Sequence, residues 1–189
     1  MNIGILGGTF NPIHNGHIHL AESACREIPL ERLIWIPTAI SPLKSEEALL
    51  DAKQRYQMVQ LAIKGYPNWE VSDIELDPTK PSYTVDSLEQ LAKRFPPPHK
   101  LYLVIGSDNL VQFPQWKESS RILKLAEVVA MTRHGYSLRF AQGPTRLIPI
   151  RPMNISSSRI RKEIQAGNSI QGMVPEAVLE FIKKGGLYK

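Results

Sequence analysis

The fold of this chain is decided by Asn2-Ile3-Gly4-Ile5-Leu6-Gly7-Gly8-Thr9-Phe10-Asn11-Pro12-Ile13-His14-Asn15-Gly16-His17. Residues 2–6 are a short apolar run, typical of a buried strand. Residues 18–28 carry apolar side chains at helical spacing and predict an amphipathic helix. The pair Gly7–Gly8 therefore lies at a strand-to-helix turn, where unpaired N–H groups and the helix dipole attract an anion. His14 and His17 share a face if the first helical turn includes both, and would then point at that anion.

Two common glycine-rich motifs do not fit this turn. The dinucleotide fingerprint needs Gly-x-Gly-x-x-Gly and an acidic residue that ends the second strand. Here the glycines are Gly4, Gly7 and Gly8, and the second strand ends in Trp35-Ile36-Pro37. A P-loop needs Gly-Lys followed by Ser or Thr, which is absent. The sequence therefore argues against a dehydrogenase and against a P-loop hydrolase.

The histidines at positions 14, 17 and 19 also allow a second reading as metal ligands. The rest of the chain adds only His99, His134 and Cys25 as soft ligands, and Cys25 falls on the apolar helix face. We therefore expect no structural zinc site and assign no metal-binding residue.

Length and composition predict a single domain, residues 1–189, with a sizeable core. One cysteine rules out an intramolecular disulfide and fits a reducing compartment. The first apolar segment has no basic region before it and predicts a strand rather than a signal peptide. No apolar run approaches the roughly 20 residues of a membrane helix. We expect a soluble, cytoplasmic protein.

The net charge of +5 and the pI of about 9.3 suit small anionic substrates. An ordinary basic surface explains the same charge. The sequence lacks the basic run with interleaved aromatic residues that would indicate nucleic-acid binding. We expect neither a nucleic-acid nor a membrane partner, and the sequence leaves a homo-oligomer open.

Apolar runs and helical patterns alternate along the chain. The expected strands cover residues 2–6, 32–37, 69–76, 101–105, 128–131 and 146–150. The expected helices cover residues 16–28, 52–64, 85–95, 119–125, 159–166 and 175–185, with Asp51 and either Ser82 or Thr84 as N-caps. This order predicts the α/β class: a Rossmann-like, doubly wound, mainly parallel sheet with helices on both faces and a small helical C-terminal part.

Two later segments add polar groups to the same edge of the predicted sheet. Gly106-Ser107-Asp108 follows the strand at 101–105, and ligands of open α/β sheets bind at the carboxyl ends of the strands. Asp108 either accepts from ribose hydroxyls or caps the next helix. Ser156-Ser157-Ser158 precedes a helix that carries Arg159 and Arg161. These serines are either a plain N-cap or part of a second phosphate site.

The string Gly7–His17 resembles the signature of the nucleotidyltransferase superfamily, which transfers adenylyl or cytidylyl groups. Over nearly its whole length the chain resembles the bacterial nicotinate-nucleotide adenylyltransferases. The stretches that carry this resemblance are Gly7–His17, Pro81-Ser82-Tyr83-Thr84, Ile105–Asp108 with Phe113-Pro114-Gln115-Trp116, Ile155–Arg161 and the closing residues 174–188. The second and third stretches point to a pyridine nucleotide as acceptor, whereas the first and the Ile155–Arg161 stretch define only the superfamily.

This resemblance implies adenylyl transfer from ATP to nicotinate mononucleotide with Mg²⁺, giving nicotinate adenine dinucleotide and pyrophosphate. It implies that His14 and His17 are catalytic and contact the ATP phosphates. The further ATP-binding residues that it implies are Gly7, Gly8, Thr9, Phe10, Gly106, Asp108, Ser156, Ser157 and Arg161. For the pyridine nucleotide it implies Thr84 and Trp116, with Trp116 stacked on the ring, and also Lys44 and Arg133.

The sequence departs from the family pattern at two positions. Leu43 stands where many relatives have histidine, and Ser158 stands where threonine is usual. The first departure affects the expected contact of the loop around Lys44, whereas the second retains the hydroxyl.

The acceptor's phosphate is already ionised at neutral pH, so the reaction needs no general base. Catalysis then rests on positioning and on electrostatic stabilisation of phosphate charge. Protonated histidines would help most, and nearby phosphates raise a histidine pKa. Two alternatives share part of the pattern: a sister enzyme such as phosphopantetheine adenylyltransferase, and a non-catalytic nucleotide-binding sensor. The N-terminus of the helix after Thr84 favours nicotinate over its amide, because its N–H groups suit a carboxylate.

Overall fold

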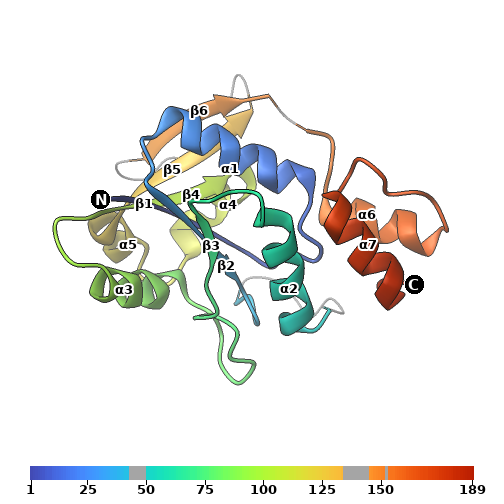
Figure 1. Ribbon diagram of the computed structural model, residues 1–189. Coiled ribbons are helices and arrows are strands. Elements are labelled where there is room, and N and C mark those ends of the chain that lie inside the picture. Colours follow the sequence, from blue (N-terminus) through green and yellow to red (C-terminus); the bar gives the residue numbers. More distant parts are fainter. Residues whose placement is uncertain (43–49, 134–144, 152) are drawn as a thin grey trace.

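The computed structural model describes residues 1–42, 50–133, 145–151 and 153–189 (Figure 1). At its centre lies a six-stranded parallel sheet of order β3-β2-β1-β4-β5-β6. The strands are β1 (Asn2–Gly8), β2 (Arg32–Pro37), β3 (Trp69–Val71), β4 (Lys100–Gly106), β5 (Ala126–Arg133) and β6 (Thr145–Ile150). Because the chain starts in the middle and winds outward in both directions, the predicted doubly wound sheet is confirmed.

Helices cover both faces of this sheet, which confirms the predicted layers (Figure 1). On one face lie α1 (Asn15–Glu27) and α2 (Ala52–Ile63), with α6 (Ser157–Gln165) and α7 (Glu176–Gly185) beside them as the small C-terminal part. On the other lie α3 (Thr84–Arg94), α4 (Ser107–Gln112), the 3₁₀ turn η1 (Phe113–Gln115) and α5 (Ser119–Leu125).

Alternation along the strands separates the two cores. In β2, Leu33 and Trp35 face the core beneath α1 and α2, whereas Ile34 and Ile36 face the core beneath α3 and α5. Successive strand residues point to opposite faces, so a strand buried on both faces reads as a continuous apolar run. The apolar run at 32–37 therefore gave the correct strand boundaries.

Several element boundaries differ from the sequence-based expectation, and three of these differences concern the end of β1, the end of β3 and the start of α3. First, β1 continues through Gly7 and Gly8, which pair with Ile36 and Pro37. Glycine can take part in this pairing because the hydrogen bonds between strands are made by backbone groups. Second, β3 ends at Val71 instead of residue 76, since the chain then turns and the backbone N–H of Leu76 donates to the Asp73 carbonyl.

The third difference concerns the start of α3. The expected caps Ser82 and Thr84 are wrong, because the N-cap is Tyr83, without a side-chain cap bond. The Ser82 hydroxyl instead donates to the Glu75 carbonyl. By contrast, Asp51 caps α2 as expected, since its carboxylate accepts from the N–H groups of Lys53 and Gln54.

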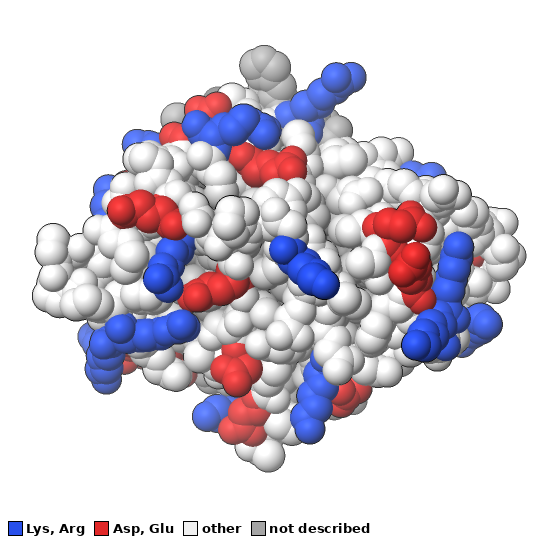
Figure 2. All heavy atoms as spheres, in the orientation of Figure 1, with Lys and Arg blue, Asp and Glu red and all other residues white. Residues whose placement is uncertain are grey.

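Charged side chains of both signs intermingle on the molecular face drawn in Figure 2. The excess of positive charge is therefore not gathered into one patch on that face. In the described ranges, no helix has the length and apolar character needed to cross a membrane.

Candidate active site

Two cavities lie at the carboxyl end of the sheet. The larger, of about 680 Å³, is bordered by the turn after β1, the start of α4 and the start of α6. The smaller, of about 330 Å³, lies between the ends of β1 and β2 and the elements α3, α4 and η1. Both are lined by Gly7, Gly8, Thr9, Asn109 and Gln112. Ligands in the two cavities would therefore meet at Gly7, Gly8 and Thr9, where β1 ends.

His14 and His17 lie together at the start of α1, as predicted. His14 is the N-cap, His17 is the third helical residue, and their rings stack with centroids 3.7 Å apart. The Nδ1 atom of His17 accepts a hydrogen bond of 3.2 Å from the backbone N–H of His14. In neutral His17 the ring proton must then be on Nε2, which makes that atom a donor. Both side chains line the larger cavity.

The rings of this histidine pair are held by their neighbours. A Cβ atom at Gly16 would lie only 3.0 Å from Cε1 and Nδ1 of His14, so this position suits glycine. The ring of Phe10 meets His17 edge to face at 5.1 Å and packs against Trp35 at 5.5 Å. Phe10 is only 2% exposed. Its contact with ATP stays a prediction, and its observed packing supports His17.

Burial changes the expected charge of the histidine pair. His14 is 7% exposed, and burial lowers its pKa to about 4, although a backbone hydrogen bond acts in the opposite direction. His14 is therefore neutral in the free protein at neutral pH. A bound phosphate would raise this pKa, because the negative charge favours the imidazolium form.

We expect this buried histidine to make stability depend on pH. The pKa of His14 is 6.5 in the unfolded chain and about 4 in the folded one. Between these values the unfolded chain binds more protons, so stability is full above pH 6.5 and is lost as the pH falls towards 4. The loss reaches about 3 kcal/mol. Urea unfolding at pH 7.5, 6 and 5 measures it, and His14→Gln should remove this part of the slope. Identical slopes for the two proteins would contradict the prediction.

The turn between β1 and α1 is fixed through its carbonyl groups. Ser157 Oγ donates to the Pro12 carbonyl at 2.9 Å, and Arg161 Nη1 donates to the Asn11 carbonyl at 2.9 Å. Ser157 and Arg161 thus lie at the larger cavity, as expected, but these donors hold the turn. Ser156 is the N-cap of α6, because its hydroxyl accepts from the N–H of Arg159.

Sequence reasoning missed Arg55, which is 1% exposed. Its guanidinium donates to the carbonyls of Thr9, Thr38, Ala39 and Leu50. It therefore joins the turn after β1 to the end of β2 and to the start of α2. A signal was present, because Arg55 lies on the same helix face as buried Met58, Val59 and Ala62. A charged residue on an apolar helical stripe is unusual and marks a buried cation.

At the second turn, Gly106 is the N-cap of α4 and Asp108 lies in the first helical turn. The reading of Asp108 as a helix cap is therefore wrong. Its exposed side chain borders the larger cavity together with Gly106, which leaves it placed to accept from a nucleoside.

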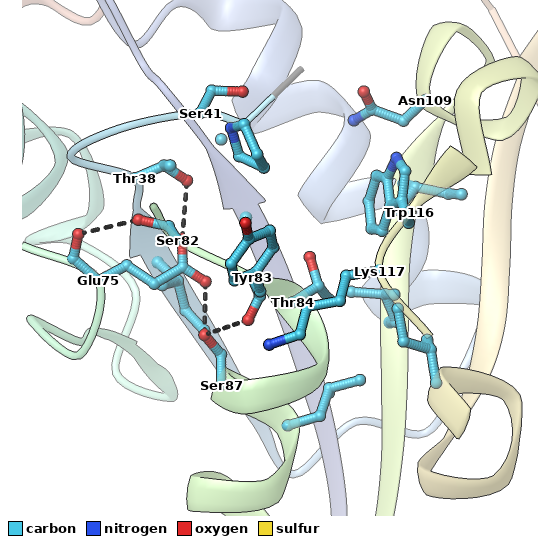
Figure 3. A pocket seen from close by; sticks show the side chains of 18 of the residues that line it. Thr38, Ser41, Glu75, Ser82, Tyr83, Thr84, Ser87, Asn109, Trp116 and Lys117 are labelled. Atoms are coloured by element: carbon cyan, nitrogen blue, oxygen red, sulfur yellow. Dashed lines mark hydrogen bonds between the residues drawn. The ribbon is translucent and has the colours of Figure 1, made fainter. Parts of the chain in front are cut away.

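Of the four residues predicted for the pyridine nucleotide, Thr84 and Trp116 line the smaller cavity (Figure 3). Figure 3 shows Thr38, Glu75 and Ser82 on one side and Asn109 and Trp116 on the other, with Tyr83 and Thr84 between them.

The Trp116 ring packs against Phe113 with centroids 5.5 Å apart. Lys117, which sequence reasoning missed, holds its Nζ atom 4.3 Å from the Tyr83 ring centre and 3.2 Å from Asp86. Lys44 lies outside the described residues. Of Arg133 only the backbone, at the end of β5, is described.

The described part of the chain contains no group of three His, Cys, Asp or Glu residues that could hold a metal ion. The histidines at positions 14, 17 and 19 thus do not form such a group within it.

A parallel sheet with a Gly-Gly-Thr turn, a stacked histidine pair and two adjoining cavities defines an α/β protein of the nucleotidyltransferase type. The cytidylyltransferase-like family model matches residues 5–163. Relatives named "Probable nicotinate-nucleotide adenylyltransferase" match at 37% identity in Dehalococcoides mccartyi, over 100% of this chain and 97% of the relative, and at 39% in Thermus thermophilus, over 100% of both. The chain therefore belongs to the cytidylyltransferase-like family and, within it, to the nicotinate-nucleotide adenylyltransferases.

Solved structures agree with this fold. Plasmodium falciparum nicotinic acid mononucleotide adenylyltransferase complexed with NaAD has a TM-score of 0.79 at 22% identity. The match covers 99% of this chain and 97% of that one. At this identity the likeness concerns the fold alone.

Proposed function

We propose that this chain transfers the adenylyl group of ATP to nicotinate mononucleotide, giving nicotinate adenine dinucleotide and pyrophosphate in NAD biosynthesis. One observation carries the proposal: two cavities of different character meet at Gly7–Thr9. The larger has the histidine pair and two helix starts, which suit phosphates. The smaller has an aromatic wall and a cation, which suit a pyridine nucleotide. The family membership of the chain supports the same reaction.

In this proposal ATP occupies the larger cavity, and one domain, residues 1–189, carries the whole activity in the cytoplasm. The N–H groups of the turn and the side chains of His14, His17, Ser156 and Arg161 would face the phosphates. Gly106 and Asp108 would hold the adenosine. A divalent metal ion, which we take to be Mg²⁺, accompanies ATP as part of the substrate.

The reaction forms a bond between a phosphate oxygen of the acceptor and the α-phosphorus of ATP. It breaks the bond from that phosphorus to the bridging oxygen, which leaves with pyrophosphate. No proton must be removed from the nucleophile. The chain's contribution is to hold two anions in line and to donate hydrogen bonds to the growing charge. Nε2 of His17 is the side-chain donor for this role, because Nδ1 already accepts from the His14 N–H.

Trp116 should matter for the acceptor and little for ATP. Stacking on one base contributes about 1–3 kcal/mol, so Trp116→Ala is expected to raise KM for nicotinate mononucleotide by about 5- to 150-fold. Steady-state kinetics with each substrate varied in turn measures the effect. An unchanged KM for the mononucleotide, or an equal rise for ATP, would contradict the assignment.

Pyrophosphate release tests the function itself. The chain is incubated with ATP and Mg²⁺ together with nicotinate mononucleotide, its amide or pantetheine phosphate. Strong preference for the first supports the proposal. Activity with pantetheine phosphate alone would refute the roles of Thr84 and Trp116. Binding of ATP without release of pyrophosphate in the presence of any of the three acceptors would indicate a sensor.

A further inference from the structure

Glu75 is a half-buried carboxylate in the wall of the smaller cavity, and the reaction does not use it. Thr38 Oγ1 donates to its Oε2 at 2.9 Å, and Ser87 Oγ donates to its Oε1 at 2.6 Å (Figure 3). Thr38 follows β2, whereas Ser87 belongs to the first turn of α3. The carboxylate therefore joins two walls of the cavity and borders its interior.

Among the described residues, the carboxylate of Glu75 forms no ion pair. Two hydroxyl groups donate to its oxygens, and Lys117, which lines the same cavity, pairs instead with Asp86. Burial raises its pKa, while the bonds from Ser87 and Thr38 lower it. A carboxylate taken out of water is costly unless an opposite charge lies nearby. An uncharged glutamine could also form hydrogen bonds with these two hydroxyl groups, so the bonds by themselves do not require a carboxylate.

The expected occupant of this cavity brings the missing charge. A pyridine ring that is bonded to ribose through its nitrogen is a pyridinium cation with a permanent positive charge. Trp116 lies across the cavity from Glu75, with Tyr83 and Thr84 between them, so a ring stacked on the indole would face the side of the cavity that carries the carboxylate (Figure 3). Both neighbours attract a cation.

We propose that Glu75 is a specificity-determining residue, which selects the cationic pyridinium ring over the uncharged dihydropyridine ring of a reduced pyridine mononucleotide. This inference rests on the proposed function, because that function supplies the occupant. The selection acts through charge, since the two rings have the same substituents and nearly the same size.

The test compares the binding of two mononucleotides to the purified full chain. Calorimetry gives Kd for nicotinate mononucleotide and for its 1,4-dihydro form, with wild type and with Glu75→Gln. Glutamine has the same size and can still accept a hydrogen bond. We expect wild type to prefer the pyridinium form by about tenfold or more. Glu75→Gln should weaken binding of that form by a similar factor and leave the dihydro form within about threefold.

Ser87→Ala is the matched control. It removes one hydrogen bond to Glu75 and keeps the charge, so the preference for the pyridinium form should remain even if both affinities fall. Circular dichroism confirms that each variant is folded. A Glu75→Gln variant that weakens both ligands equally, or one that retains the full preference, overturns the inference, as does the absence of binding to wild type. Pyrophosphate release is measured separately, so failure of the reaction and failure of this selection give different results.

Discussion

Replacing His17 by alanine is expected to lower kcat by about 10²–10³, which is the usual effect of losing one donor to a developing oxyanion. The stacked rings place His17 beside His14, and the bond from the His14 N–H fixes its donor at Nε2. The substitution removes this donor and leaves the Gly7–Gly8 backbone unchanged. KM for nicotinate mononucleotide should change little, because His17 lines the larger cavity only.

Stopped-time assays of pyrophosphate release with saturating substrates measure this effect. His99→Ala is the matched control, since His99 lines neither of the two cavities. A folded His17→Ala protein with near-normal kcat would refute the catalytic assignment. Loss of ATP binding with unchanged kcat would instead assign His17 to ground-state binding.

Arg55→Met is expected to lower both stability and turnover. Methionine fills much of the same space but leaves four carbonyl groups without their donor. Each buried polar group without a partner costs about 1–3 kcal/mol. Removal of the buried charge offsets part of this, so the free energy of unfolding should fall by about 3–5 kcal/mol. Turnover should fall as well, because the Thr9 carbonyl belongs to the turn shared by both cavities.

Urea unfolding and steady-state kinetics at a temperature where the variant is folded separate the two effects. Lys53→Met on the same helix is the control, since Lys53 is exposed and should change stability by no more than about 0.5 kcal/mol. Arg55→Lys retains the charge but lacks the planar guanidinium group with its several donors, so its losses of stability and turnover should be intermediate. Wild-type stability and turnover in Arg55→Met would show that the four bonds do not position the turn.

Local patterns were sufficient for much of the fold. The apolar run at 32–37 and the helical spacing after His17 depend on neighbours within a few residues, so they predicted β2 and α1 well. The prediction failed where distant contacts decide the outcome. Ser82 resembles a helix cap in sequence, yet its hydroxyl bonds to Glu75, which lies on the other side of a turn.

The sequence by itself determined the parallel α/β class, the glycine turn and the pairing of His14 with His17, because these follow from short-range spacing. Only the tertiary structure decided the charge of His14, the partners of Ser157 and Arg161, the burial of Arg55 and the hydroxyl partners of Glu75. Ser157 and Arg161 bond to carbonyls 145 and 150 residues away in the chain. Burial and hydrogen-bond partners set pKa values and orient donors, and both depend on packing between elements that no local pattern records.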